Sequence, residues 1–204
     1  RPISVRNLAA RAAAIFECWY LGQETGRAMA EALFGDINPG GKLPITIPRS
    51  VGHIPAYYNH KPAARRGYLF DDVTPLYAFG FGLSYTQFQF GRPRLKRSVI
   101  GKDESTAVRV DVTNTGPRAG DEVVQMYIQD KVSSVTRPVK ELKGFQRITL
   151  APGETRTVSL EITPEHLAFY DIDMKHVVEP GEFEIMVGNS SRDQDLQKTM
   201  LRVK

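Results

Sequence analysis

The fold of most of this chain is decided by the stretch VRVDVTNTG, residues 108–116. Its valines alternate with polar residues and are followed by a turn sequence. A period of two places the apolar side chains on one face of a β-strand and the polar ones on the other. A strand with one apolar face must bury that face against a second layer, so the stretch predicts a layered all-β unit.

The same alternation continues on both sides of this stretch, from Ser84 to the C-terminus. Further strands are predicted around 85–90, 124–128, 145–150, 158–162, 183–187 and 201–203. The pairs Pro152-Gly153 and Pro180-Gly181 predict turns, the first of type II. About seven short strands separated by regular turns are typical of an antiparallel sandwich. A Cys–Trp–Cys pattern is missing from the sequence, which favours a fibronectin type III-like sandwich over an immunoglobulin domain.

Residues 1–50 follow a different pattern, in which helix and strand signals alternate. The apolar run at 15–20 predicts a buried strand, and 23–33 predicts an amphipathic helix ended by Gly35 in the left-handed conformation. Residues 43–48 predict a strand between prolines, at a sheet edge. Strand, helix and strand at this spacing indicate the end of an α/β unit with a parallel sheet. This piece is too small to cover both faces of such a sheet.

Composition excludes several classes of function. The formal net charge is +4 and the isoelectric point about 9.2, but the basic residues are interspersed with acids, as in 140–143 and Arg192-Asp193. Such scattering predicts a solvated surface and no nucleic-acid partner. No apolar run approaches the roughly 20 residues of a membrane span. Cys18 is the only cysteine, which excludes an internal disulfide and a thiolate zinc cluster.

Local motifs predict no catalytic residue, metal or cofactor. The adjacent acids Asp71-Asp72 and Asp121-Glu122 are interpreted as solvated side chains, because neighbours on a strand point to opposite faces. The four histidines lack a metal-binding spacing. Gly80-Phe81-Gly82 lacks the third glycine and the helix of a dinucleotide site, so it is interpreted as a turn.

Several stretches in order resemble the C-terminal portion of glycoside hydrolase family 3, and most of all its bacterial β-glucosidases. They are AEALFGDINPGGKLP at 30–44, PRSVG at 48–52, YYNHKP at 57–62, PLY at 75–77, FGFGLSY at 79–85, RPVKELKGF at 137–145 and LAPGE at 150–154. The resemblance implies a barrel, an α/β sandwich domain and a fibronectin type III-like domain. Residues 1–50 would then be the C-terminal part of the α/β sandwich domain, 51–83 a linker and 84–204 the fibronectin type III-like domain.

The activity that the resemblance implies is the retaining hydrolysis of terminal, non-reducing β-D-glucosidic bonds. Retention needs two carboxyl groups roughly 5–5.5 Å apart. In the family both lie upstream of the motifs found here, so we expect the isolated chain to be inactive. The implied partners are the upstream barrel and α/β portion, a β-glucoside or oligosaccharide, and a second copy in a homodimer. A periplasmic or extracellular location is expected, and the start at Arg1 indicates a piece of a longer protein.

The long, aromatic-rich connection at 51–83 is the candidate for substrate contact. We hypothesise that Arg66, Tyr68 and Asp71 approach the rim of the active site or a subunit contact. The alternative is that the segment only links and pins neighbouring domains. A different class of function also remains open, that of a non-catalytic module that binds carbohydrate or protein. The helix and strands of residues 18–48 argue against that alternative, because such a module has no use for them.

Overall fold

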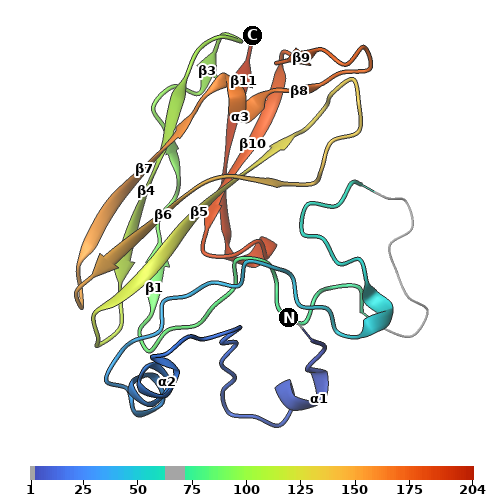
Figure 1. The fold of residues 1–204 in the computed structure, drawn as a ribbon. Helices are drawn as coiled ribbons and strands as arrows, with labels where there is room; N and C mark the ends of the chain where they lie inside the picture. Colours follow the sequence, from blue (N-terminus) through green and yellow to red (C-terminus); the bar gives the residue numbers. More distant parts are fainter. Residues whose placement is uncertain (1–2, 63–71) are drawn as a thin grey trace.

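A two-layer β-sandwich fills most of the molecule, with two helices at one end (Figure 1). The computed structural model describes residues 3–62 and 72–204. The elements are α1 Arg6–Ala9, α2 Thr25–Phe34, the 3₁₀ turn Val51–His53, β1 Phe88–Phe90, β2 Arg94–Leu95, β3 Val99–Ile100, β4 Thr106–Asn114, β5 Gly120–Asp130, β6 Glu141–Leu150, β7 Thr155–Ile162, α3 Pro164–Leu167, β8 Phe169–Tyr170, β9 His176–Val177, β10 Gly181–Gly188, the 3₁₀ turn Asp193–Asp195 and β11 Leu196–Val203.

The two layers of the sandwich are sheets of four and five strands. In the first, β4 pairs with β7 along one edge and with β1 and β2 along the other, all antiparallel. The second has the order β3-β11-β10-β5-β6, in which only the β11–β3 pair is parallel. A small β8–β9 hairpin lies outside both. This is the predicted fibronectin type III-like fold.

The core forms between the two sheets, from the residues that the period of two selects. Val108, Val110 and Val112 are at most 1% exposed, and Arg109 between them is exposed. The facing sheet supplies Val124, Met126, Ile128, Ile185 and Val187 to the same cluster. Each fully buried side chain of this size contributes about 1.5–3 kcal/mol, so the cluster dominates the stability of the sandwich.

The two Pro-Gly pairs have different outcomes. At Gly153 φ is +74°, and the Glu154 amide donates to the Ala151 carbonyl at 3.0 Å, which confirms the first turn. The second prediction is wrong, because Gly181 begins β10. The chain reverses earlier, where the Met174 amide donates to Asp171 at 3.1 Å. Glycine permits a left-handed turn, but here Gly181 pairs with Val203 of β11 and remains part of the strand.

The helical part of residues 1–50 is confirmed and its strands are not. Helix α2, Thr25–Phe34, matches the helix predicted at 23–33 to within two residues, and Gly35 follows it with φ +84°. Residues 15–20 form no strand, and Tyr20 is 89% exposed. A strand needs a neighbouring edge to satisfy its backbone groups, and nothing in the described part of the chain pairs with this stretch.

None of the described helices is long and apolar enough to cross a membrane.

Residues 43–48 form less of a strand than predicted, but they do find a partner. Ile47 and Tyr77 make a single antiparallel bridge. Leu43 extends it, because its amide donates to the Phe81 carbonyl at 2.9 Å and its carbonyl accepts from Gly80 at 2.8 Å. We call residues 42–47 and 76–82 the ribbon. The ribbon lies against the five-stranded sheet, where Phe79 packs on the buried cluster of Tyr127, Met186 and Leu196.

Candidate functional site

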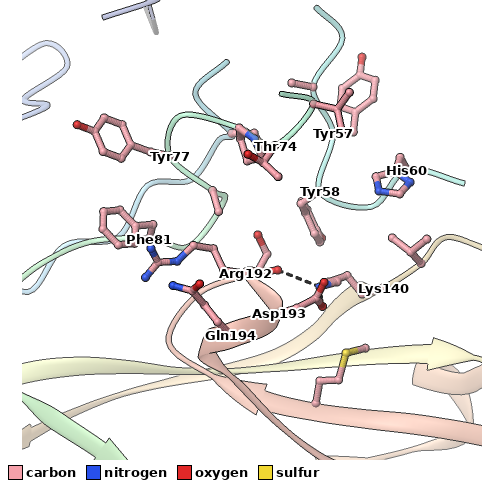
Figure 2. Close-up of a pocket in the computed structure, with 18 of the residues that line it drawn as sticks. Tyr57, Tyr58, His60, Thr74, Tyr77, Phe81, Lys140, Arg192, Asp193 and Gln194 are labelled. Atoms are coloured by element: carbon pink, nitrogen blue, oxygen red, sulfur yellow. Dashed lines mark hydrogen bonds and ion pairs between the residues drawn. The ribbon is translucent and has the colours of Figure 1, made fainter. Parts of the chain in front are cut away.

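A pocket of about 1010 Å³ lies between the 51–83 segment and the five-stranded sheet (Figure 2). Arg66, Tyr68 and Asp71 lie outside the described residues, so their role remains a prediction. The described residues that flank them, at 56–60 and 73–78, line the pocket on one side. Loop 189–195, between β10 and β11, lines the opposite side through residues 191–194. The pocket therefore adjoins the segment that the sequence singles out.

Tyr58 attaches the first lining stretch, residues 56–60, to the sandwich. Its ring stacks on Phe79 with the centroids 4.3 Å apart and meets the edge of Tyr127 at 5.8 Å. The backbone amide of Leu142 donates to the Tyr58 hydroxyl at 3.2 Å. Next to it, the Val139 amide donates to the His60 carbonyl at 3.0 Å. Stacked rings and hydrogen bonds to strand backbone hold this irregular stretch in place.

Arg49 holds the second lining stretch, residues 73–78, in place. Its Nε donates to the Thr74 carbonyl at 2.9 Å, and its Nη2 donates to the Thr74 hydroxyl at 2.9 Å and to Asp72 at 3.3 Å. The Thr74 amide also donates to Asp72 at 2.8 Å, and this bond is the main reason why the pKa of Asp72 is lowered. The described residues before and after positions 63–71 are thus anchored, Tyr58 to the sandwich and Thr74 to Arg49.

Loop 189–195 is held by its own side chains and by the ribbon. Arg192 donates to both carboxylate oxygens of Asp195, at 2.7 and 3.0 Å, and its guanidinium lies 4.5 Å from the centroid of the Phe81 ring. The Ser191 amide donates to the Phe79 carbonyl at 3.0 Å. Planar bidentate pairing and stacking on an aromatic face suit arginine specifically. The loop therefore presents residues 191–194 to the pocket in a fixed arrangement.

Lys140 joins this loop to the start of β6. Its ammonium donates to the Ser191 carbonyl at 2.9 Å and to Asp193 at 2.7 Å. Lys140 is 7% exposed, which contradicts the prediction that the charges of 140–143 are solvated. The hydrogen bond from Lys140 lowers the pKa of Asp193, so this carboxylate stays ionised at neutral pH. Asp193 itself faces solvent on the pocket side.

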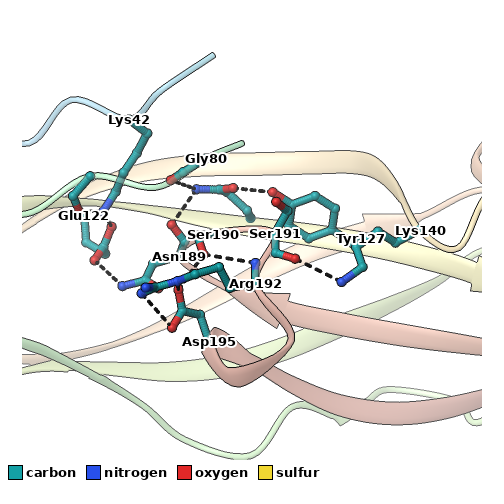
Figure 3. A network of polar contacts seen from close by, with 12 residues as sticks. Lys42, Gly80, Glu122, Tyr127, Lys140, Asn189, Ser190, Ser191, Arg192 and Asp195 are labelled. Atoms are coloured by element: carbon teal, nitrogen blue, oxygen red, sulfur yellow. Dashed lines mark hydrogen bonds and ion pairs between the residues drawn. The ribbon is translucent and has the colours of Figure 1, made fainter. Parts of the chain in front are cut away.

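A second polar network joins the ribbon to the sandwich beside the pocket (Figure 3). Glu122 is 2% exposed, and its Oε1 pairs with the Lys42 ammonium at 2.8 Å. Its Oε2 accepts from Asn189 at 3.2 Å, and Lys42 also donates to the Gly82 carbonyl at 2.9 Å. A buried charge is tolerated only when it is paired and hydrogen-bonded, as both charges are here. The interpretation of Glu122 as a solvated acid is therefore wrong.

Gln125 provides the centre of this network. Its amide nitrogen donates to the Gly80 carbonyl at 3.1 Å and to the Asn189 carbonyl at 2.9 Å, and its oxygen accepts from the Tyr127 hydroxyl at 2.5 Å. Gly80 has φ +77°, and a Cβ on it would lie 2.1 Å from the Gln125 oxygen. Only glycine permits both this backbone conformation and this approach. Gly80-Phe81-Gly82 is thus more than a turn, because it is the contact between ribbon and sheet.

The last turn of α2 is attached to the sandwich in the same way. The Tyr85 hydroxyl donates to the Ala32 carbonyl at 2.8 Å, and Arg118 donates to the Gly35 carbonyl. Asn38 accepts from the Ser84 hydroxyl at 2.8 Å and donates to the Ala119 carbonyl at 2.9 Å. Side chains of Tyr85 and Arg118 therefore bind carbonyl groups at the end of the helix, where backbone partners are few.

The remaining acids and histidines engaged by the structure have local roles. Asp121 accepts from Thr149 and from Arg147, which together lower its pKa. His166 accepts from the Thr163 amide at the start of α3, at 3.3 Å. Residues 3–62 and 72–204 gather no group of three or more acidic, histidine or cysteine side chains that could hold a metal.

Sequence reasoning missed Lys140, Asp193 and Gln125. Each is a polar residue in or beside a strand pattern, and none has a motif of its own. A usable signal was the glycine content of 79–82, because closely spaced glycines indicate that another backbone or side chain approaches. The identity of the approaching group depends on the tertiary structure.

Two family profiles match the chain. A profile described as the glycosyl hydrolase family 3 C-terminal domain matches residues 1–85, and one described as a fibronectin type III-like domain matches residues 122–191. Among characterised relatives, a β-xylosidase of Formosa agariphila is 49% identical over all of this chain and 29% of its own length. A periplasmic β-glucosidase of Salmonella typhimurium is 46% identical over 94% of this chain and 26% of its own length.

Solved structures agree with this comparison. A β-glucosidase from Erythrobacter marinus superposes with a TM-score of 0.96 at 49% identity, covering all of this chain and 27% of that protein. A β-glucosidase from Listeria innocua in complex with glucose superposes with a TM-score of 0.94 at 38% identity, covering all of this chain and 29% of that protein. The chain thus spans less than a third of the length of these relatives.

Proposed function

The chain belongs to glycoside hydrolase family 3, as the C-terminal portion of its members, and from this premise we propose that it is the structural end of a retaining β-glucosidase. The proposed enzyme hydrolyses terminal, non-reducing β-D-glucosyl residues. One observation carries the proposal: the whole chain superposes on β-glucosidases at TM-scores of 0.94 to 0.96 while covering under a third of them. The proposed partner is therefore the upstream barrel and α/β portion.

A scaffold role is supported by the way the sandwich holds the other segments. Tyr85 and Arg118 bind the end of α2, and Lys42, Gly80 and Gly82 are bound through Glu122 and Gln125. These contacts fix residues of the family 3 C-terminal match onto the fibronectin type III-like domain. A sandwich with this design orients neighbouring domains, which is how a module without catalytic groups contributes to a multidomain active site.

We propose no nucleophile or acid/base in this chain. A retaining glycosidase needs a carboxyl group whose pKa is raised and which reaches the glycosidic oxygen. Hydrogen bonds lower the pKa of Asp121 and Asp193, which makes them poor proton donors. Burial raises the pKa of Asp130, but its carboxyl oxygens are closed off from solvent and cannot reach a sugar.

The test is an aryl β-glucoside assay of the purified chain, alone and then mixed with the upstream portion. We expect no turnover by the chain alone and hydrolysis when the two parts are combined. Hydrolysis by the 204-residue chain alone would refute the proposal. The same assay with an aryl β-xyloside tests a second candidate substrate, which is favoured by the 49% identity to a β-xylosidase.

For Arg66, Tyr68 and Asp71 we propose contact with substrate at the rim of the active site. The support is positional, because the residues on either side of them are anchored, Tyr58 by Phe79 and Leu142, and Thr74 by Arg49. Changing Tyr68 to Ala in the assembled enzyme should raise KM for an oligosaccharide. Unchanged kinetic constants would leave the segment as a linker only.

The relative from Salmonella typhimurium is named a periplasmic enzyme, and we propose a periplasmic or extracellular location for this protein. We also propose a homodimer, which light scattering of the assembled enzyme would test.

The alternative of a free-standing binding module is less well supported. Such a module would not need the bonds between Tyr85, Arg118 and α2.

A further inference from the structure

The pocket beside loop 189–195 has the size and lining of a small-molecule site. Binding pockets for small ligands have volumes of about 300–1,000 Å³ and combine aromatic side chains with a few polar groups. This one has a volume of about 1010 Å³ and is lined by the rings of Tyr57, Tyr58 and Tyr77. Tyr57 is 67% exposed, so a ligand can reach its ring.

The charges around the pocket are paired with one another. Lys140 pairs with Asp193 at 2.7 Å. Lys198 and Lys131 share Glu184, at 3.3 and 4.0 Å. Arg49 pairs with Asp72 at 3.3 Å, and Arg192 with Asp195 at 2.7 Å. An anionic ligand would have to displace these carboxylates from their cations. A cationic ligand would have to displace the cations from their carboxylates. The lining therefore favours a ligand without net charge.

Hydrogen-bonding groups are available for such a ligand. The hydrogen bond from Lys140 holds the Asp193 carboxylate in place, and most of the Asp193 side chain is exposed. Gln194 is exposed beside it and adds an amide that can both donate and accept (Figure 2). A carboxylate and an amide opposite tyrosine rings match a compound that has hydroxyl groups around its edge and C–H groups on its faces.

We propose that this pocket binds a neutral, β-linked oligosaccharide, with Tyr57 against a sugar face and Asp193 and Gln194 accepting from sugar hydroxyls. The choice of a β-linked oligosaccharide rests on the proposed function. Binding itself needs no hydrolysis, so the two ideas fail separately.

The experiment is calorimetric titration of the 204-residue chain with cello-oligosaccharides and laminari-oligosaccharides. We expect saturable binding that tightens from the disaccharide to the tetrasaccharide. Tyr57→Ala and Asp193→Asn should each weaken binding by about fivefold to tenfold, and Tyr57→Phe should bind like the unchanged chain because it keeps the ring. Thermal unfolding of each variant establishes that the chain is folded.

Tyr170→Ala is the matched control, because Tyr170 is 60% exposed but lies in β8, away from the pocket. It should leave binding unchanged. The proposal is overturned if no oligosaccharide binds, or if folded Tyr57→Ala and Asp193→Asn variants bind normally. Tighter binding of a sulfated or phosphorylated sugar would also overturn it, since that result contradicts the paired charges. Loss of aryl β-glucoside hydrolysis in the assembled enzyme would instead count against the proposed function.

Discussion

Two irregular regions of the molecule differ in how they are held: residues 12–22 and loop 189–195. In the first, Trp19 and Tyr20 are 41% and 89% exposed, and the Trp19 amide bonds to the nearby Glu17. In the second, Ser190 and Ser191 are 1% and 7% exposed. The loop is ordered by bonds to Lys140, the ribbon and the sandwich. An irregular backbone is thus fixed by partners that satisfy its polar groups, whatever its own propensity.

The largest expected effect comes from breaking the buried pair of Lys42 and Glu122. Lys42→Met leaves Glu122, at 2% exposure, without a cation. Removing one partner of a buried pair costs about 3–5 kcal/mol, and we expect about 3 kcal/mol because Glu122 keeps its bonds to Val123 and Asn189. Urea unfolding of the chain measures the loss.

Lys102→Met is the control for that variant, because Lys102 is exposed. It should change the free energy of unfolding by less than about 0.5 kcal/mol. If Lys42→Met is equally mild, the network beside the pocket does not hold the ribbon as we describe.

A smaller effect distinguishes Gly80, in the ribbon beside loop 189–195, from Gly22 in residues 12–22. Gly80→Ala forces a side chain into a left-handed backbone and to within 2.1 Å of Gln125, and should cost about 2 kcal/mol. Gly22→Ala meets nothing within 4 Å and should change stability by less than about 0.5 kcal/mol. Thermal unfolding of the two variants gives the comparison, and equal shifts in Tm would contradict it.

The smallest effect is on acid stability and involves Asp121. Hydrogen bonds from Thr149 and Arg147 lower the pKa of the Asp121 carboxyl in the folded chain. The ionised group therefore stabilises the fold at every pH above its ordinary pKa of 3.8. That contribution is lost as the pH falls through the lowered value. Asp121→Asn should cost about 0.5 kcal/mol at neutral pH, and the difference from the unchanged chain should shrink below pH 3.8.

Denaturant unfolding at neutral and acid pH measures this difference. Asp103→Asn, at an exposed position, is the control and should show the same stability as the unchanged chain at neutral pH. A difference for Asp121→Asn that stays constant down to pH 2, about the value at which strongly bonded carboxylates titrate, would refute the assignment.

Much of the fold could be predicted because its signals are local. The alternation in 108–112 places three valines in the core, and the helix ending at Gly35 is where its pattern predicts. Composition alone could not decide whether residues 15–20 form a strand, since a strand also needs a neighbouring edge to pair with. The turn predicted at Pro180-Gly181 failed for a related reason, because the pairing of Gly181 with β11 decided its conformation.

The candidate site was predicted only in outline. The aromatic and charged residues of 51–83 indicated where to look, and the pocket adjoins them. Lys140 and Glu122 were expected to be solvated, but each is buried against a partner far away in the sequence. Lys140 precedes β6 and has no strand pattern of its own. Glu122 has the same parity as Val124 and Met126 in β5, so the period of two places it on the core face, but no local pattern identifies its distant partner Lys42.

By itself the sequence determined the sandwich, the helix before it and the family, since periodicity and ordered motifs depend on residues close together in the chain. Tertiary structure alone decided which charges are buried, which irregular segments are fixed and where the pocket lies. The physical reason is that the cost of burying Glu122 or Lys140 depends on the partner that reaches it. Those partners come from segments that only the folded chain brings together.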